Sequence, residues 1–107
     1  MSGSFGELGS LLKQAQKMQR DLDKAREELR KTTVEGTAGA GAVRVVVTGD
    51  RQVTVVEISK ETLETCDKEM IEDLVLAALR DGISRAAKLA DETMGKVTGG
   101  VNLPGLF

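Results

Sequence analysis

Two valine-rich runs separated by a short polar loop constrain the fold of this chain more than any other feature. Residues 43–47 and 53–58 are dominated by β-branched side chains, and the loop between them contains Gly49 followed by Asp50. Runs of this length and composition, bounded by a Gly-Asp pair, are typical of a β-hairpin. Glycine in the first loop position favours a type II′ turn, because glycine readily adopts a positive φ.

The predicted turn sets the register of the hairpin and divides its side chains between two faces. In this register Val46 faces Val53, and Val47 faces Gln52. Successive side chains of a strand point to opposite faces, so one face of the hairpin should form a hydrophobic core. That face carries Val43, Val45, Val47, Val56 and Ile58, together with Gln52 and Thr54.

The second face of the hairpin is half apolar, which is unusual for a sheet face left in water. It carries Arg44, Val46, Val53, Val55 and Glu57. Arg44 lies diagonal to Glu57 and is close enough for a cross-strand ion pair. The chain has only two aromatic residues, both near the termini, so its core is small and oligomerisation is one remedy. We therefore expect a homodimer with Val46, Val53 and Val55 at its interface.

Residues 7–31 predict a long amphipathic helix. Apolar side chains alternate spacings of three and four, which is the a/d pattern of a heptad repeat. The series is Leu8, Leu11, Ala15, Met18, Leu22, Ala25 and Leu29. A helix of about 25 residues is roughly 37 Å long at about 1.5 Å per residue, which is more than a short hairpin can cover. Part of the helix should therefore protrude or pack on another helix, and residues 1–6 should form a flexible leader.

Basic side chains follow the side of this predicted helix opposite the apolar seam. The stripe consists of Lys13, Lys17, Arg20, Lys24 and Lys31. One interpretation is a solvated face neutralised by pairs such as Arg20–Asp23 and Lys24–Glu28. The other is a face that contacts phosphates. A net charge of −2 excludes a generally basic surface but not a local basic stripe.

A third strand and a second long helix complete the predicted fold. Residues 32–35 should form a strand that leads through a glycine-rich turn into the hairpin. Ser59 should cap a short helical turn, and Asp67 should begin a long helix with apolar residues at helical spacing. Basic residues also decorate this helix, namely Arg80, Arg85 and Lys88. Gly82, in its interior, predicts either a kink or a close contact.

These elements together predict a single α+β domain over residues 1–107. Its parts are a long N-terminal helix, a three-stranded antiparallel sheet and a long C-terminal helix. Gly99 and Gly100 should end the second long helix, because glycine suits the left-handed residue that follows many helices. Residues 101–107 should form a flexible tail.

The chain lacks the residue combinations on which most enzymes and metal sites depend. It has no histidine and a single cysteine, Cys66. The usual general base near neutral pH is therefore missing, and neither a zinc cluster nor an internal disulfide is possible. We expect no catalytic residue, metal, cofactor or small-molecule substrate. No signal peptide or membrane-spanning run is visible, so a cytoplasmic protein without a membrane partner is expected.

The order of elements and several segments resemble the YbaB/EbfC nucleoid-associated proteins of bacteria. The matching segments are LLKQAQKMQRDLDKAREEL at 11–29, VEGTAGAGAVRVVVTGDRQVTVVEIS at 34–59, DKEMIEDLVLAALRDGISRA at 67–86 and LPG at 103–105. The resemblance implies a small cytoplasmic homodimer that binds DNA and associates with the nucleoid. It also implies a tweezer-like dimer in which sheets meet at the centre and long helices protrude. The family's basic, glutamine-rich helix is matched at Lys13, Gln14, Gln16, Lys17 and Gln19.

We therefore predict a homodimer that binds double-stranded DNA through its phosphates, with little base specificity and an influence on gene expression. The candidate contacts are Lys13, Lys17, Arg20, Lys24, Lys31, Arg80, Arg85 and Lys88. The alternative is a dimeric interaction adaptor that docks a partner protein through the heptad seams. Adaptor binding would survive moderate salt and would need Leu11, Met18 or Leu22, whereas DNA binding would depend steeply on salt and need the lysines.

Overall fold

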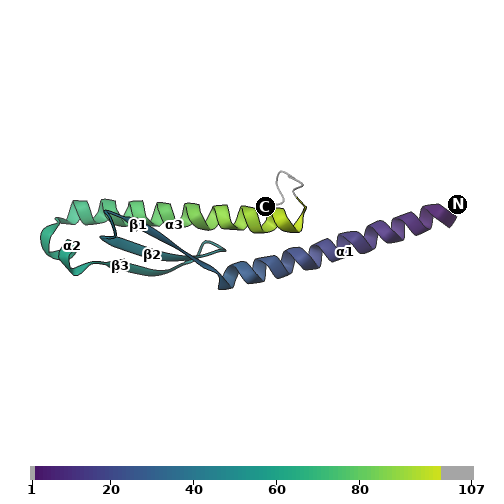
Figure 1. Ribbon diagram of the computed structural model, residues 1–107, viewed down its shortest axis with the longest axis horizontal. Coiled ribbons are helices and arrows are strands. Elements are labelled where there is room, and N and C mark those ends of the chain that lie inside the picture. Colours follow the sequence, from purple (N-terminus) through teal and green to yellow (C-terminus); the bar gives the residue numbers. More distant parts are fainter. Residues whose placement is uncertain (1, 100–107) are drawn as a thin grey trace.

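The computed structural model describes the backbone of residues 2–99 and the side chains of residues 6–99 (Figure 1). In chain order the elements are α1 (Ser2–Lys31), β1 (Thr33–Ala38), β2 (Val43–Thr48), β3 (Val53–Ile58), α2 (Lys60–Thr65) and α3 (Lys68–Val97). This order confirms the predicted α+β class, with its long N-terminal helix, three-stranded antiparallel sheet and long C-terminal helix. Helix α1 begins earlier than predicted, and the predicted tail of residues 101–107 lies outside the described residues.

The ends of the helices follow the predicted capping residues. Ser59 caps α2 by accepting a hydrogen bond from the amide of Thr62, and Asp67 caps α3 by accepting one from the amide of Met70. Gly99 follows the C-cap of α3 with a φ of 67°, the left-handed conformation that glycine adopts without a steric cost. These local signals were therefore sufficient to place the beginning of α2 and both ends of α3.

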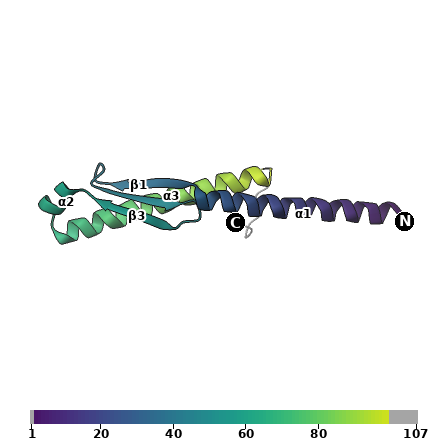
Figure 2. The same cartoon turned by 90° about the horizontal axis from the view of Figure 1, so that it is seen from below.

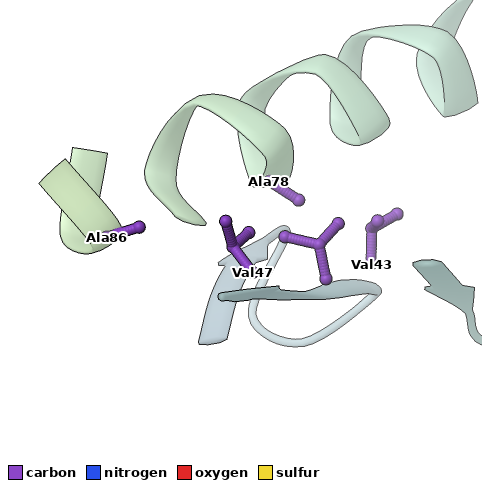
Figure 3. Close-up of a cluster of buried hydrophobic side chains, with 5 residues drawn as sticks. Val43, Val47, Ala78 and Ala86 are labelled. Carbon is purple, nitrogen blue, oxygen red and sulfur yellow. The ribbon is translucent and has the colours of Figure 1, made fainter. Parts of the chain in front are cut away.

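The hydrophobic core lies between the sheet and α3. Strand β2 is central and antiparallel to both neighbours, and α3 lies over β1 and β2. Val43, Val45 and Val47 of β2 are fully buried and form one cluster with Ala78 and Ala86 of α3. In Figure 3 the side chains of Val43 and Val47 lie between the sheet and this helix. The alternation predicted for this strand is therefore confirmed. Because the facing side chains are valine and alanine, the helix and the sheet lie close together.

Strand β1 and α3 approach so closely that both carry glycine at the contact. A Cβ atom on Gly36 would lie 2.3 Å from the amide nitrogen of Gly82 and 2.4 Å from the carbonyl oxygen of Ala78. A Cβ atom on Gly82 would lie 2.8 Å from a methyl group of Val47. Gly82 thus marks a close contact, which was one of its two predicted roles.

The loop between β2 and β3 differs from the predicted two-residue turn. The amide of Thr48 donates to the carbonyl of Gln52 at 2.8 Å, so three residues, 49–51, form the loop. Arg51, rather than Gly49, has the positive φ, at 68°. Glycine is needed at position 49 for space, because a Cβ atom there would lie 2.6 Å from the carbonyl oxygen of Leu29. The predicted type II′ turn was therefore wrong.

The longer loop shifts the pairing of the hairpin. Val46 pairs with Val55, and after a β-bulge Val47 pairs with Val53, so the predicted pairing of Val46 with Val53 was wrong. An extra residue in one strand interrupts the ladder and the alternation of side chains at that point. Val46 and Val55 still share the face that points away from α3. Val53 lies beyond the bulge, opposite Val47, so its side chain does not follow the alternation of the rest of the strand.

Arg44 connects all three strands on the face of the sheet away from α3. It lies directly opposite Glu57, and its Nε atom is 3.1 Å from a carboxylate oxygen of Glu57. Its guanidinium group also pairs with Glu35 of β1. The hydrogen bond and the charge of Glu57, assisted by Glu35, raise the pKa of Arg44. The predicted cross-strand pair is therefore confirmed, although the two residues are opposite rather than diagonal.

Strand β3 is the exposed edge of the sheet. Val53, Val55 and Val56 are 41%, 37% and 48% exposed in the single chain. Val56 was predicted in the core, but α3 lies over β1 and β2 and leaves β3 uncovered. Only Ile58, at the end of the strand, is half-buried against the core.

The opposite edge of the sheet, at β1, is tied to α3 through Asp81. The backbone amide of Thr37 donates to a carboxylate oxygen of Asp81 at 3.0 Å, and the Nε atom of Arg85 lies 3.1 Å from the other oxygen. The hydrogen bond from Thr37 and then the interaction with Arg85 lower the pKa of Asp81. One outward-pointing amide of β1 is thus satisfied within the chain.

Replacing Asp81 with asparagine should remove an acid-sensitive part of the stability. Because the native pKa of Asp81 is depressed, its contribution is complete above the ordinary value of 3.8 and is lost as the pH falls through the native pKa. In urea titrations, the difference in unfolding free energy between the native chain and D81N should be constant near neutral pH and shrink below about pH 3.8. D73N, which removes a charge from an exposed position of α3, is the control. A D81N effect that is the same at every pH would contradict the proposed charge dependence.

Candidate nucleic-acid interface

Helix α1 extends beyond the sheet as a single unsupported helix (Figures 1 and 2), and the longest dimension of the molecule is 77 Å. Near its C-terminal end, Leu22, Ala25 and Leu29 are buried against Met94 of α3. All residues from 6 to 21 are exposed. We call residues 6–21 the arm. The prediction that part of this helix protrudes is confirmed for the single chain.

The arm contains a stretch of α1 that has basic residues but no acidic ones. Residues 8–20 contain Lys13, Lys17 and Arg20 but no acidic residue, so this stretch carries a charge of +3. Residues 21–31 contain four basic and four acidic residues, which cancel. We call Lys13, Lys17 and Arg20 the arm cations. The stripe predicted from the sequence is therefore uneven in its surroundings. No acidic residue lies within three positions of Lys13 or Lys17, whereas Asp21 and Asp23 lie that close to Arg20.

Among residues 6–31 of α1, ion pairs are confined to the half nearest the sheet. Asp23 pairs with Arg26 at 3.4 Å, and not with Arg20 as one interpretation of the sequence suggested. The other suggested pair, Lys24 with Glu28, is also absent from the ion pairs of residues 6–99. Within the same residues, no carboxylate pairs with any arm cation. The arm cations are thus available to an external anion.

The three candidates on α3 lie on the body of the molecule rather than on the arm. Arg80, Arg85 and Lys88 are all exposed. Arg85 is engaged by Asp81, and Arg85 and Lys88 line a shallow cavity of about 540 Å³ that also includes Glu35 and Glu92. Nearby carboxylates therefore offset the charge of Arg85 and Lys88. The structure groups the arm cations with one another but does not bring these three residues to them.

Three arginines that the sequence pattern did not single out gather at the base of the arm. Arg26 and Arg30 of α1 and Arg51 of the β2–β3 loop line one cavity of about 370 Å³. The loop reaches α1 because the amide of Gly49 donates to the carbonyl of Leu29 at 2.9 Å. The four-residue spacing of Arg26 and Arg30 indicates a shared helix face. Arg51 joins these two arginines only through the contact between the β2–β3 loop and α1.

The part of the chain that the structure describes shows neither a membrane-spanning helix nor a metal cluster. No helix there combines the length and the apolar composition needed to cross a membrane. No group of three or more histidine, cysteine, aspartate or glutamate side chains in that part could hold a metal ion. Cys66 is a half-buried thiol at the C-cap of α2.

Comparison with known proteins decides the family. Residues 5–101 match the YbaB/EbfC DNA-binding family. The chain belongs to this family. A relative from Acetivibrio thermocellus, named "Nucleoid-associated protein", is 43% identical over 106 residues, which are 98% of this chain and 94% of that protein. A relative of the same name from Bacillus thuringiensis (strain Al Hakam) is 47% identical over 105 residues, which are 98% of this chain and 96% of that protein.

A solved structure agrees with the fold. The crystal structure of an uncharacterized protein from Helicobacter pylori superposes with a TM-score of 0.72 at 25% sequence identity. The superposition covers 89% of this chain and 97% of the other. Together with the family match, it confirms the resemblance that the helix, strand and glycine segments indicated.

Proposed function

We propose that this chain is a nucleoid-associated protein whose homodimer binds double-stranded DNA through phosphates, with little base specificity. Family membership supports DNA as the partner. The exposed arm cations, which have no ion-pair partner among the described residues, are the observation that supports the arm as the DNA-binding site. Lysine and arginine side chains that contact phosphates position a protein on DNA without reading its sequence. We also propose that the protein is located in the cytoplasm, at the nucleoid, and that it influences gene expression. The proposal includes no catalytic step.

The arm cations have a geometry that suits one DNA strand. Their spacings of four and three residues keep Lys13, Lys17 and Arg20 within about 60° of one another around the helix, and they span about 10 Å along its axis. Phosphates of one strand recur about every 3.4 Å along the DNA axis, so about three fall within that span. Each arm is therefore proposed to neutralise about three phosphates, with Lys24 and Lys31 as outlying members of the stripe.

A salt titration of binding to duplex DNA tests this assignment. With about six phosphates neutralised by the two arms of a dimer, the logarithm of the association constant should fall with the logarithm of salt at a slope near −5. Duplexes of unrelated sequence should give nearly the same slope. A slope shallower than about −2 would contradict a phosphate-based site of this size.

The exposed β3 strand supports the proposed homodimer. The β1 edge has an amide satisfied by Asp81, whereas β3 exposes valines along an unpaired edge. Exposed, apolar strand edges tend to pair with another chain. Val46 is half-buried beside Val55 on the same face. We therefore keep Val46 and Val55 on this face, together with Val53 on the exposed edge strand, as the proposed interface.

Replacing Val55 with aspartate should convert the dimer into a folded monomer. The side chain is 37% exposed in the single chain, so a charge there is tolerated by the monomer but would be buried without a partner in the dimer. Light scattering at micromolar concentration should give 11.4 kDa for V55D and twice that mass for the native chain. T33D, on the exposed surface of β1, should remain dimeric. A native chain that is monomeric under these conditions would contradict the dimer.

The adaptor alternative keeps one specific observation in its favour. The arm exposes large apolar side chains, with Leu8, Leu11 and Leu12 about 60% exposed and Met18 40% exposed. Exposed apolar groups on a protruding helix are typical of helix docking sites. Because Leu22 is buried against α3, the test uses L11S and M18S. A protein partner captured at high salt and lost in both variants would favour the adaptor.

A further inference from the structure

The cavity at the base of the arm combines apolar and cationic groups in a way that suits a phosphorylated ligand. Its volume of about 370 Å³ falls within the range of about 300–1,000 Å³ typical of ligand sites. Its buried lining includes Leu29 and Met94, which are 6% and 5% exposed, with half-buried Ala90 beside them. Its exposed lining consists of Arg26, Arg30, Asp50, Arg51 and Asp91.

The two arginines from α1 retain donors for a ligand. Arg26 uses one terminal nitrogen to contact Asp23 at 3.4 Å, and Arg30 uses one to contact Glu27 at 3.1 Å. Their side chains remain 49% and 64% exposed. A guanidinium group has five N–H donors, and exposed ion pairs of this kind are weak. A phosphate can therefore bind both groups without first breaking a strong interaction.

Arg51 occupies a backbone position that favours glycine. Its φ of 68° lies in the left-handed region, where any side chain carries a steric cost. The loop is held there because the amide of Gly49 donates to the carbonyl oxygens of Leu29 and Thr32, both at 2.9 Å. Within residues 6–99 Arg51 forms no ion pair with a carboxylate. The loop therefore presents at the cavity a guanidinium group that has no ion-pair partner among the described residues.

We propose that this cavity binds a phosphate-bearing ligand, with the phosphate on Arg26, Arg30 and Arg51. The neighbouring apolar surface can cover a base or another apolar part of the ligand. The carboxylates of Asp50 and Asp91 can accept hydrogen bonds from sugar hydroxyls or ring amino groups. A free nucleotide and a nucleotide unit of DNA share this chemistry. The site is separate from the arm cations, because its α1 residues lie on the side of α1 that meets α3.

A ligand in this cavity contacts α1, the β2–β3 loop and α3 at once. These are the elements that meet where the arm leaves the body of the protein. Occupancy therefore links the arm to the body at a second set of contacts, in addition to the packing of Leu22, Ala25 and Leu29 against Met94.

Two variants test the site without disturbing the fold. R51G removes the guanidinium group and places glycine where the backbone favours it, so its melting temperature should equal or exceed that of the native chain. R30Q removes a charge from an exposed position of α1. K60Q, at the opposite end of the molecule from the arm, is the control for loss of one positive charge.

Calorimetry with ATP and with pyrophosphate measures the free-nucleotide source, and gel shifts with a 20-base-pair duplex at fixed salt measure the DNA source. If the ligand is a free nucleotide, ATP binds the native chain, and R51G and R30Q each weaken ATP binding by about tenfold or more. If the ligand is DNA, ATP does not bind, and each variant reduces the salt slope by about one per protomer.

Absence of ATP and pyrophosphate binding, together with unchanged duplex affinity in both variants, would overturn the proposal. Equal losses in K60Q would overturn it as well, because they would reflect net charge alone. The ATP measurement does not depend on the arm, so failure of the arm as a DNA site and failure of the cavity as a phosphate site give different results.

Discussion

Reversing the charges of Lys17 and Arg20 to glutamate should weaken binding to duplex DNA by on the order of 1,000-fold at about 0.1 M salt. The double change removes four of the six proposed phosphate contacts of a dimer, and each contact contributes about 0.9 to the salt slope. Such a loss corresponds to about 4 kcal/mol. Because phosphate contacts carry little sequence information, all duplexes should be affected alike. Gel shifts at several salt concentrations measure both the affinity and the slope.

The matched control for this experiment reverses Lys60 and Lys68 instead. Both double variants change the net charge from −2 to −6, because each reversal subtracts two charges. Lys60 and Lys68 begin α2 and α3, at the end of the molecule opposite the arm (Figure 1). Their reversal should reduce affinity only slightly. All four positions are exposed, so each fold should survive with a change of about 0.5 kcal/mol or less per site.

A folded, dimeric variant with Lys17 and Arg20 reversed and unchanged affinity would show that the arm is not the site. The remaining candidates from the sequence would then be Arg80, Arg85 and Lys88 of α3. Equal losses in the two double variants would instead indicate a general effect of net charge.

Replacing Gly36 with alanine should lower the free energy of unfolding by about 3 kcal/mol or more. The added Cβ atom would lie 2.3 Å from the amide nitrogen of Gly82, 2.4 Å from the carbonyl oxygen of Ala78 and 2.6 Å from the Cα atom of Gly82. All three are backbone atoms, so no side-chain rotation can relieve the overlap, and β1 must move away from α3. Thermal unfolding should show a melting temperature lower by roughly 15 °C.

Two further glycine-to-alanine changes calibrate this result. A Cβ atom on Gly82 would meet methyl groups of Val47 and Val45 at 2.8 and 2.9 Å, and these side chains can shift, so G82A should cost less than G36A. A Cβ atom on Gly95, in the same helix, would meet nothing within 4 Å, so G95A should be neutral or stabilising by about 0.5 kcal/mol. Equal stability of G36A and G95A would show that β1 and α3 do not pack this closely in solution.

The fold class was accessible from the sequence because the signals for it are local. Valine runs, a heptad of apolar residues and the capping residues Ser59 and Asp67 each specify structure within a few neighbouring positions. The alternation in β2 also identified Val43, Val45 and Val47 as core residues, since this central strand is covered as the pattern requires. The stripe of cations on α1 was visible for the same reason, because helical spacing alone places its members on one face.

The sequence did not determine the register of the hairpin or the coverage of β3. Both loop lengths are compatible with Thr48-Gly49-Asp50-Arg51, and the contact between Gly49 and the end of α1 selects the longer one. Val56 follows the same alternation as Val45, yet it is 48% exposed because α3 is displaced toward β1. Alternation predicts which side chains share a face, but only packing decides whether another element covers that face.

The tertiary structure also decided which part of α1 is the exposed arm and which part packs against α3. Leu11 and Leu22 occupy the same heptad seam, but Leu22 is buried by α3 and Leu11 is 61% exposed. The position at which α3 ends decides this difference, and no local pattern in α1 encodes it. Arg51 joins Arg26 and Arg30 for a similar reason, since a loop 21 residues beyond Arg30 in the chain is brought to α1 by backbone hydrogen bonds. The sequence by itself determined the elements and their apolar and basic faces, whereas the contacts between distant elements decided which of those faces remain exposed.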